Sequence, residues 1–290
     1  MITMPGFRPL RLASLMLLAA SGAACAADLA NEVPPPEKPL WELGVGMGVA
    51  AFPHYPGSNQ TRAWVFPFPY VVYRGKFLRA DRDGVRGQLL STDRVDFNIS
   101  VLGSLPVSSH DDNARAGMPD LKPTIEIGPS MEVHLWRSPS RDMLLDLRLP
   151  VRMGITLESS PKTIGWQFEP NVNLDLVDVA GVSGLRVGMF AGPMFADGKY
   201  SDHFYTVAPQ YATPGRSAFQ ASGGYAGTQA LVSMSRRFSR YWVGAFMRYA
   251  NLAGASFADS PLVRRKSVLS GGVALAWVFG QSSKTVASDE

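Results

Sequence analysis

The chain has little charge, few histidines and almost no cysteine. Charged residues make up 18% of its 290 residues, and it contains four histidines and a single cysteine, Cys25. Such a chain cannot build a disulfide framework or a zinc–thiolate site, and it offers few imidazoles for general acid–base catalysis. Hydrophobic residues nevertheless make up 46% of the sequence. Because few charged side chains remain to form a hydrated surface, something other than water must face much of this apolar area.

Long hydrophobic runs are absent beyond the first 30 positions, which excludes a membrane protein built from transmembrane helices. At the N-terminus, Arg8 and Arg11 precede a short apolar run over 12–20, and small residues follow through Ala27. The run is too short to span a bilayer and ends in small residues. This pattern predicts a secretory signal peptide over residues 1–26, removed by cleavage.

Cys25 allows an alternative to this prediction. In a lipoprotein the chain would be cleaved just before the cysteine and acylated on it, but Gly22 stands where such signals usually have leucine. Loss of the two signal-peptide arginines lowers the net charge from +4 to +2. This balance gives no reason to expect a nucleic acid partner.

Two segments outside the expected domain have their own composition. Residues 27–40 hold Pro34, Pro35, Pro36 and Pro39 and predict a stiff periplasmic linker. Residues 281–290 are polar, and we expect them to be a disordered tail. The domain itself is expected over residues 41–280.

Alternation with a period of two dominates this domain and is clearest over 142–157. The apolar positions are Met143, Leu145, Leu147, Leu149, Val151, Met153, Ile155 and Leu157, and the polar ones are Asp146, Arg148, Arg152 and Thr156. Segments of similar length and alternation lie at 124–136, 166–176 and 185–195. Soluble strands usually run about 5 or 6 residues, whereas a tilted membrane strand needs about 9 to 11. These lengths favour a barrel with lipid outside and polar side chains inside.

We therefore expect an all-β fold, a transmembrane antiparallel β-barrel of about 12 strands. The predicted strands are 41–52, 62–73, 76–82, 84–91, 95–103, 123–136, 142–157, 164–177, 184–195, 217–235, 240–251 and 267–279. Short connections are expected on the periplasmic side, and long outer loops at 104–122, 196–216 and 252–266. Pro67 and Pro69 and the turn Asp83–Gly84 interrupt the pattern between 62 and 91.

Several strings resemble the MipA/OmpV family of outer-membrane proteins. They run in the family's order: His54-Tyr55-Pro56-Gly57-Ser58, Pro67-Phe68-Pro69-Tyr70, Asp81-Arg82-Asp83-Gly84, Phe204-Tyr205-Thr206-Val207, Gly223-Gly224-Tyr225 and Asp259-Ser260-Pro261-Leu262-Val263. The family often has two tyrosines where this chain has Phe204-Tyr205. The resemblance implies an outer-membrane scaffold that holds a periplasmic lytic transglycosylase, and also a murein synthase. Other members look like adhesins or are linked to antibiotic response.

The sequence predicts no enzyme, cofactor or metal site. His54 and His203 are expected in outer loops, and His134 is expected to form a lumen pair with Glu132. The string His110-Asp111-Asp112 is interpreted as a solvated acidic loop rather than a cation site.

Three non-enzymatic roles stay open. A scaffold would use periplasmic contacts, for which the candidates are Arg137, Arg141, Arg236, Arg237 and Arg240, although these arginines could instead bind lipid phosphates. A small-solute pore would need an open lumen, but the expected lumen mixes Glu126, Glu132, Asp146, Glu169 and Asp175 with Arg148, Arg152 and Arg186. Such mixed charges would pair across the barrel and narrow it. An adhesin would use the outer loops 104–122 and 252–266.

Overall fold

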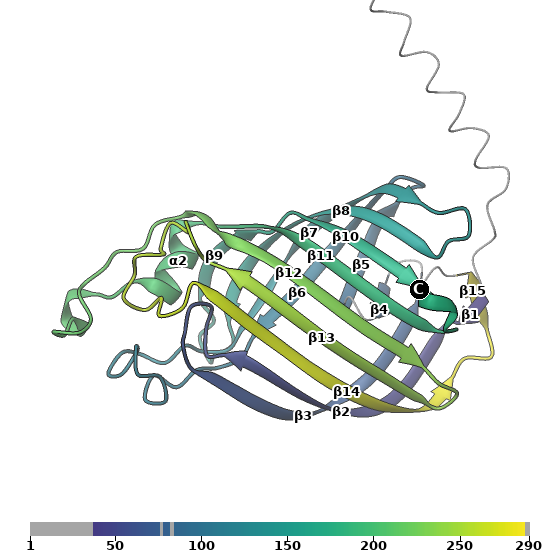
Figure 1. The fold of residues 1–290 in the computed structure, drawn as a ribbon, viewed down its shortest axis with the longest axis horizontal. Coiled ribbons are helices and arrows are strands. Elements are labelled where there is room, and N and C mark those ends of the chain that lie inside the picture. The colour runs from purple at the N-terminus through teal and green to yellow at the C-terminus, as the bar shows by residue number, and fades with distance from the viewer. Residues whose placement is uncertain (1–36, 76–77, 82–83, 288–290) are drawn as a thin grey trace, which may run out of the picture.

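The computed structural model describes residues 37–75, 78–81 and 84–287. The predicted signal peptide and residues 27–36 of the predicted linker lie outside this part. One antiparallel sheet of 13 strands makes up most of the protein (Figure 1). Its strands are β2 (Trp41–Pro53), β3 (Thr61–Arg74), β4 (Leu78–Asp81), β5 (Gly84–Ser91), β6 (Val95–Ser104), β7 (Thr124–Arg137), β8 (Met143–Thr156), β9 (Thr163–Phe168), β10 (Asn171–Val177), β11 (Leu185–Ala196), β12 (Gly224–Arg237), β13 (Tyr241–Asn251) and β14 (Ser267–Gln281).

The sheet closes on itself as the predicted transmembrane barrel. The first and last long strands, β2 and β14, pair with each other, and β10 pairs with both β8 and β11. The single strand predicted over 164–177 is two strands, because the chain is interrupted at Glu169–Pro170 and proline has no N–H for the ladder. Since β9 and β10 both lie between β8 and β11, the 13 strands occupy twelve positions around the barrel.

Small and apolar residues alternate along the wall. In β2, Val45 and Met47 are more than half exposed on the outer face, while Gly46 and Gly48 face inward beside Phe68 and Phe66 of β3. Similar exposed apolar side chains recur around the barrel. Among the described residues, no helix is long and apolar enough to cross a membrane. The outward-facing side chains of the strands are therefore largely apolar, which suits a surface in contact with lipid.

The two ends of the barrel differ. Short turns join the strands at one end, which we assign to the periplasm, and long connections lie at the other. The connection after β11 contains helix α2 (Gly198–Tyr205) and a 3-10 turn (Pro209–Tyr211). The sequence did not predict α2, whose N-cap Asp197 accepts a hydrogen bond from the backbone N–H of Tyr200 at 2.7 Å.

One predicted strand boundary is wrong, and so is the expectation of disorder for part of the C-terminal tail. The strand predicted over 217–235 begins only at Gly224, because the chain before it pairs with the loop, with a bridge between Val207 and Phe219. The tail expected to be disordered contributes β15 (Thr285–Ala287), which pairs with β1 (Glu37–Pro39) from the predicted linker. An even number of barrel positions brings β1 and β15 to the same, periplasmic, side, where the two short strands pair (Figure 1, right).

Candidate functional site at the outer end of the barrel

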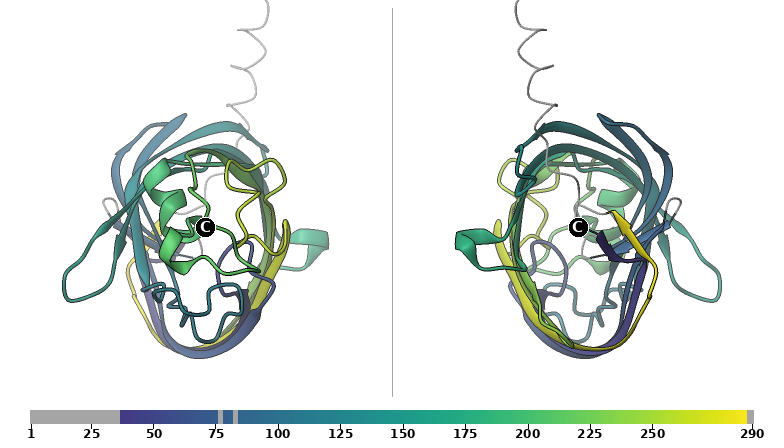
Figure 2. Two further views of the ribbon diagram at one scale, coloured as in Figure 1. Left: turned by 90° about the vertical axis from the view of Figure 1, so that its left-hand side faces the viewer. Right: turned by 90° about the vertical axis from the view of Figure 1, so that its right-hand side faces the viewer.

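The long outer connections fold over the mouth of the barrel. We define the outer cap as the segments 54–60, 105–123, 197–223 and 252–266. These segments share a cluster of buried apolar side chains with Ile164 of β9. The cap contributes Tyr55, Val107, Ala114, Leu121, Phe204, Tyr205, Val207, Ala221, Leu252, Ala255, Phe257, Ala258 and Leu262. Seen from this end, α2 and its neighbouring loops lie within the outline of the barrel (Figure 2, left).

Two tyrosines join different segments of the outer cap. Tyr205 stacks on Phe257 with ring centroids 3.7 Å apart, and its hydroxyl donates a hydrogen bond to the carbonyl of Pro56 at 3.0 Å. The hydroxyl of Tyr55 donates to the carbonyl of Leu262 at 2.8 Å. Burial raises the pKa of both tyrosines, so both hydroxyls stay protonated and act as donors.

The buried carboxylate of Asp112 links the cap segment 105–123 to the segment 54–60. Asp112 is fully buried and accepts hydrogen bonds from the Ser58 hydroxyl at 2.7 Å and from the backbone N–H of Ala114 at 3.0 Å. His54 Nδ1 also lies 3.0 Å from this carboxylate. The interpretation of 110–112 as a solvated loop is therefore wrong for Asp112, whose carboxylate is satisfied inside the protein.

Two buried arginines, which the sequence analysis missed, bind backbone carbonyls between segments. Arg115 donates to the carbonyl of Phe204 at 3.1 Å. Arg216 donates to the carbonyls of Ala114 and Ala116, each at 2.9 Å. Burial lowers the pKa of Arg115, although an arginine remains charged at neutral pH. These contacts satisfy loop carbonyls that would otherwise be buried without partners.

Gly57 has a conformation that other residues avoid. Its φ is +99°, and its carbonyl accepts hydrogen bonds from the backbone N–H groups of Arg264 at 2.8 Å and Arg265 at 3.0 Å. A Cβ atom at this position would lie 3.3 Å from Leu252. Glycine thus allows the loop after β2 to bond closely to the loop before β14.

Most of the family-motif residues predicted from the sequence meet in the outer cap. Those buried there are Tyr55, Gly57, Ser58, Tyr205 and Ser260. The Ser260 hydroxyl donates to the carbonyl of Tyr205 at 2.6 Å. Pro261 is partly buried beside it, whereas the Asp259 side chain is 94% exposed and only 3.9 Å from Lys266. Motifs far apart in the chain therefore build one structure.

The remaining motif residues lie elsewhere. Asp81 ends β4 and Gly84 begins β5, so they flank the turn of a short hairpin. Asp83 lies outside the described residues. The structure does not bring this motif into the outer cap.

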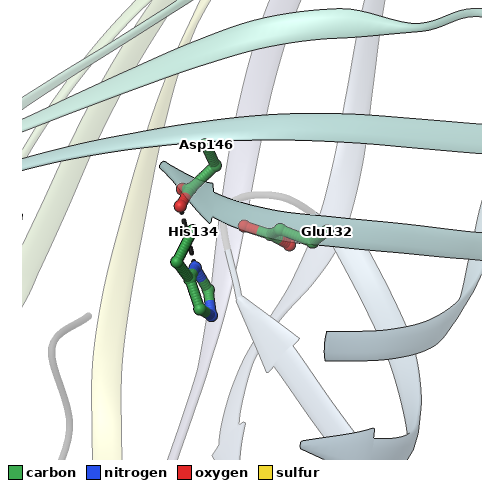
Figure 3. Close-up of side chains that lie close together, drawn as sticks. All are labelled: Glu132, His134 and Asp146. Carbon is green, nitrogen blue, oxygen red and sulfur yellow. Dashed lines mark hydrogen bonds and ion pairs between the residues drawn. The ribbon is translucent and has the colours of Figure 1, made fainter. Parts of the chain in front are cut away.

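A second polar cluster lies inside the periplasmic half of the barrel. Here Glu132, His134 and Asp146 could in principle hold a metal, since their ligand atoms lie within 4.8 Å of one another (Figure 3). His134 Nδ1, however, is bonded to Asp146 at 2.8 Å and Nε2 lies 3.5 Å from Asp96. The predicted His134–Glu132 pair is wrong, because Glu132 pairs with Arg148 at 3.4 Å. Ion pairing explains the cluster without a metal.

Opposite charges pair inside the barrel, but between neighbouring strands and not across the lumen as the sequence predicts. Arg152 lies 2.8 Å from Glu169, and Arg148 lies 3.6 Å from Asp175 as well as close to Glu132. From the outer cap, the Tyr200 hydroxyl reaches Glu126 at 3.0 Å. These ion pairs therefore run along the barrel wall, and a cavity of about 440 Å³ lies between them and the opposite strands.

The five predicted periplasmic arginines lie near two separate turns. Arg137 and Arg141 flank the β7–β8 turn and are partly buried. Arg237 is 2.9 Å from Glu42 of β2 and so is already bound within the barrel. Arg240 is exposed before β13, and the guanidinium of Arg236 lies 5.0 Å from the ring centre of Phe238. The β12–β13 turn thus presents cationic and aromatic surface together.

Comparison with known proteins gives one family. The model of the family described as MltA-interacting protein MipA matches residues 45–279. No curated protein matches. Among solved structures, a bacterial polysaccharide outer membrane secretin has 9% identity and a TM-score of 0.41, with 82% of this chain and 99% of that chain covered. The outer membrane channel DcaP of Acinetobacter baumannii has 9% identity and a TM-score of 0.33, with coverage of 84% and 97%.

Proposed function

Since the chain belongs to the family of the MltA-interacting protein MipA, we propose that it is a non-enzymatic outer-membrane scaffold whose periplasmic face binds a lytic transglycosylase. A murein synthase would join the same complex. The observation that carries this proposal is the family match, which runs from β2 to β14 and so includes the whole barrel. The family's name describes an interaction rather than a reaction, and this supports a binding role.

A periplasmic partner must contact the end with short turns. The β12–β13 turn is the best candidate because Phe238 is 45% exposed between Arg236 and the exposed Arg240. Arginine and aromatic side chains supply much of the energy of protein interfaces. Arg237 is a poorer candidate, since its guanidinium is bound to Glu42.

The structure of the outer end favours the scaffold function rather than an open pore. The outer cap covers the mouth with a packed apolar cluster, and the lumen below it is lined with paired charges of both signs. An adhesin would have to use the outward faces of the same cap segments. Large single-channel currents through the unaltered protein in planar bilayers would favour the pore.

The direct test is a cross-linked pull-down from native outer membranes, followed by mass spectrometry. We expect a lytic transglycosylase to be enriched, and the double variant Phe238→Ser/Arg240→Glu to capture less than a tenth as much. The matched control is Arg265→Glu, the same charge reversal at an exposed arginine of the opposite end. Recovery of the barrel without any murein enzyme would overturn the proposal.

The lipid interpretation of the basic turns predicts a different result. If these arginines bind lipid phosphates, the double variant would lose thermal stability in bilayers with anionic headgroups, while capture of the enzyme would stay unchanged.

A further inference from the structure

Between β3 and β6, the strands that the structure describes leave the pairing of the barrel wall incomplete, and we call this place the opening. The strands β4 and β5 lie between them, but β3 pairs with β4 only at Tyr73 and Arg74. β6 pairs with β5 only from Asp96 to Ile99. In the part of the chain that the structure describes, residues 61–72 and 100–104 therefore have no strand partner on the facing sides. The opening lies in the outer half, because β3 runs from the outer end to the periplasmic end.

The length of the chain explains this opening. A tilted membrane strand needs about 9 to 11 residues, whereas β4 has 4 and β5 has 8. The described strands β4 and β5 are therefore too short to run beside the full length of β3, which has 14 residues. Pro67 and Pro69 fit an unpaired edge, since alternate residues direct their backbone nitrogens to the same side and proline has no N–H to leave unsatisfied.

An apolar cavity of about 540 Å³ lies behind the opening, below the outer cap. Trp64 and Phe66 of β3 and Leu102 of β6 line it, and Tyr205 and Phe257 line it from the cap. By strand parity Phe66 and Leu102 face inward, yet they are 39% and 43% exposed. The charged lumen thus has an apolar inner surface at the opening, and the cavity has the volume of a typical small-molecule site.

One cation at this cavity has an unused donor. Arg248 lines the cavity and also a neighbouring one of about 440 Å³ deeper in the barrel. Its Nη2 donates to Gln229 Oε1 at 2.6 Å, but its buried Nε has no hydrogen-bond partner. The acidic residues that line the cavity already have partners: Glu126 accepts from Tyr200, Glu169 pairs with Arg152, and the exposed Asp111 lies 3.9 Å from Arg62. The free bonding capacity therefore favours an anion.

We propose that the opening between β3 and β6 admits a single-chain amphiphile with a carboxylate head, of the long-chain fatty acid class, from the membrane. Its hydrocarbon chain lies along Trp64, Phe66 and Leu102, and its carboxylate binds Arg248. Burial of the chain removes apolar surface from water, and the charged hydrogen bond at Nε satisfies a donor that is otherwise orphaned. This site is independent of any partner on the periplasmic face.

The test uses a photoactivatable palmitate analogue with the folded full barrel in phosphatidylethanolamine vesicles. We expect saturable labelling of β3 and β6 at Trp64, Phe66 and Leu102, which excess palmitate displaces. Labelling that is non-saturable and spread evenly over the outer surface, including Val243 and Met247 of β13, would mean ordinary contact with surrounding lipid and would overturn the proposal.

Variants then distinguish the contact made by the carboxylate head from the contacts made by the hydrocarbon chain of the ligand. Arg248→Gln should raise the Kd for palmitate about tenfold, while the matched change Arg186→Gln, at an inward-facing arginine that lines neither cavity, should leave it unchanged. For methyl palmitate, which lacks the charge, Arg248→Gln should have no effect. Equal effects on both ligands would contradict the assigned head contact. Heat-dependent migration on gels verifies that each variant is folded.

Discussion

The outer and periplasmic ends of the barrel are held together by different interactions. The outer cap packs apolar side chains from four connections and buries Asp112 and two arginines among backbone partners. The periplasmic half instead has short turns and ion pairs between neighbouring strands, such as His134 with Asp146. The strand ladder defines the tube at both ends, so the difference arises from the connections. Variants at each end should therefore change different properties.

The largest effect is expected from Tyr205→Ala in the outer cap. The change removes the stack on Phe257 and the hydrogen bond to Pro56. Large-to-small changes of buried aromatic residues cost about 3–5 kcal/mol. We expect protease cleavage within 197–223 and larger single-channel currents than those of the unaltered protein. Tyr205→Phe is the control, since it loses only the hydroxyl, and an uncleaved cap in Tyr205→Ala would show that the stack does not hold it.

A smaller effect, still confined to the outer cap, is expected from Asp112→Ala. The Ser58 hydroxyl and the Ala114 N–H would lose their acceptor while staying buried. Orphaning such donors costs about 1–3 kcal/mol. Hydrogen exchange should speed up in 105–123 and stay unchanged in the periplasmic turns. Faster exchange at both ends would mean that the two ends are not independent.

At the lumen, Glu169→Gln should cost about 1 kcal/mol, because the amide keeps a hydrogen bond to Arg152 but loses its charge. The measurement is the thermal unfolding of the barrel in detergent, with hydrogen exchange of the outer cap as the control. Faster exchange in the outer cap with an unchanged unfolding temperature would mean that Glu169 stabilises the cap and not the barrel wall.

The smallest effect is a pH dependence of the outer cap. Burial, with a further contribution from Arg115, lowers the pKa of His203 in α2 to about 4. The unfolded loop would bind a proton near the ordinary pKa of about 6.5. The stability contributed by the neutral imidazole is therefore full above about pH 6.5 and is lost as the pH falls toward 4. Amide protection in 197–223, corrected for the intrinsic pH dependence of exchange, should fall as the pH drops through this window. It should change less in His203→Gln, and an unchanged slope would exclude His203 as the cause.

The barrel could be predicted from the sequence because its pattern is local. In 142–157 the side chains alternate between lipid and lumen, so both the strand and its faces follow from neighbouring residues. The break at Pro170 was missed because alternation continues on both sides of it. The partner of His134 was missed for another reason. Pairing of β7 with β8 places His134 opposite Asp146 and Glu132 opposite Arg148, and this register is not visible within one strand.

The outer cap could not be predicted in the same way. Arg115 and Arg216 lie in segments without periodicity, and their bonds join residues about 90 to 100 positions apart. Asp112 looked solvated beside His110 and Asp111, because only the assembled cap brings Ser58 and His54 to it. The family motifs gave the one available signal, since Tyr55, Tyr205 and Ser260 proved to be cap residues, although the sequence assigned them no role.

The pairing of β1 with β15 affects how the barrel comes apart. The seam between β2 and β14 joins the two ends of the chain, and β1 with β15 fastens it at the periplasmic side. At the outer side, the bond from Tyr55 to Leu262 fastens the same seam. The chain therefore has the entropy of a closed loop. Neither β2 nor β14 can separate from the other before the β1–β15 pairing or the Tyr55–Leu262 hydrogen bond breaks. Unfolding should begin in the wall, at the short β4–β5 hairpin, and not at the termini.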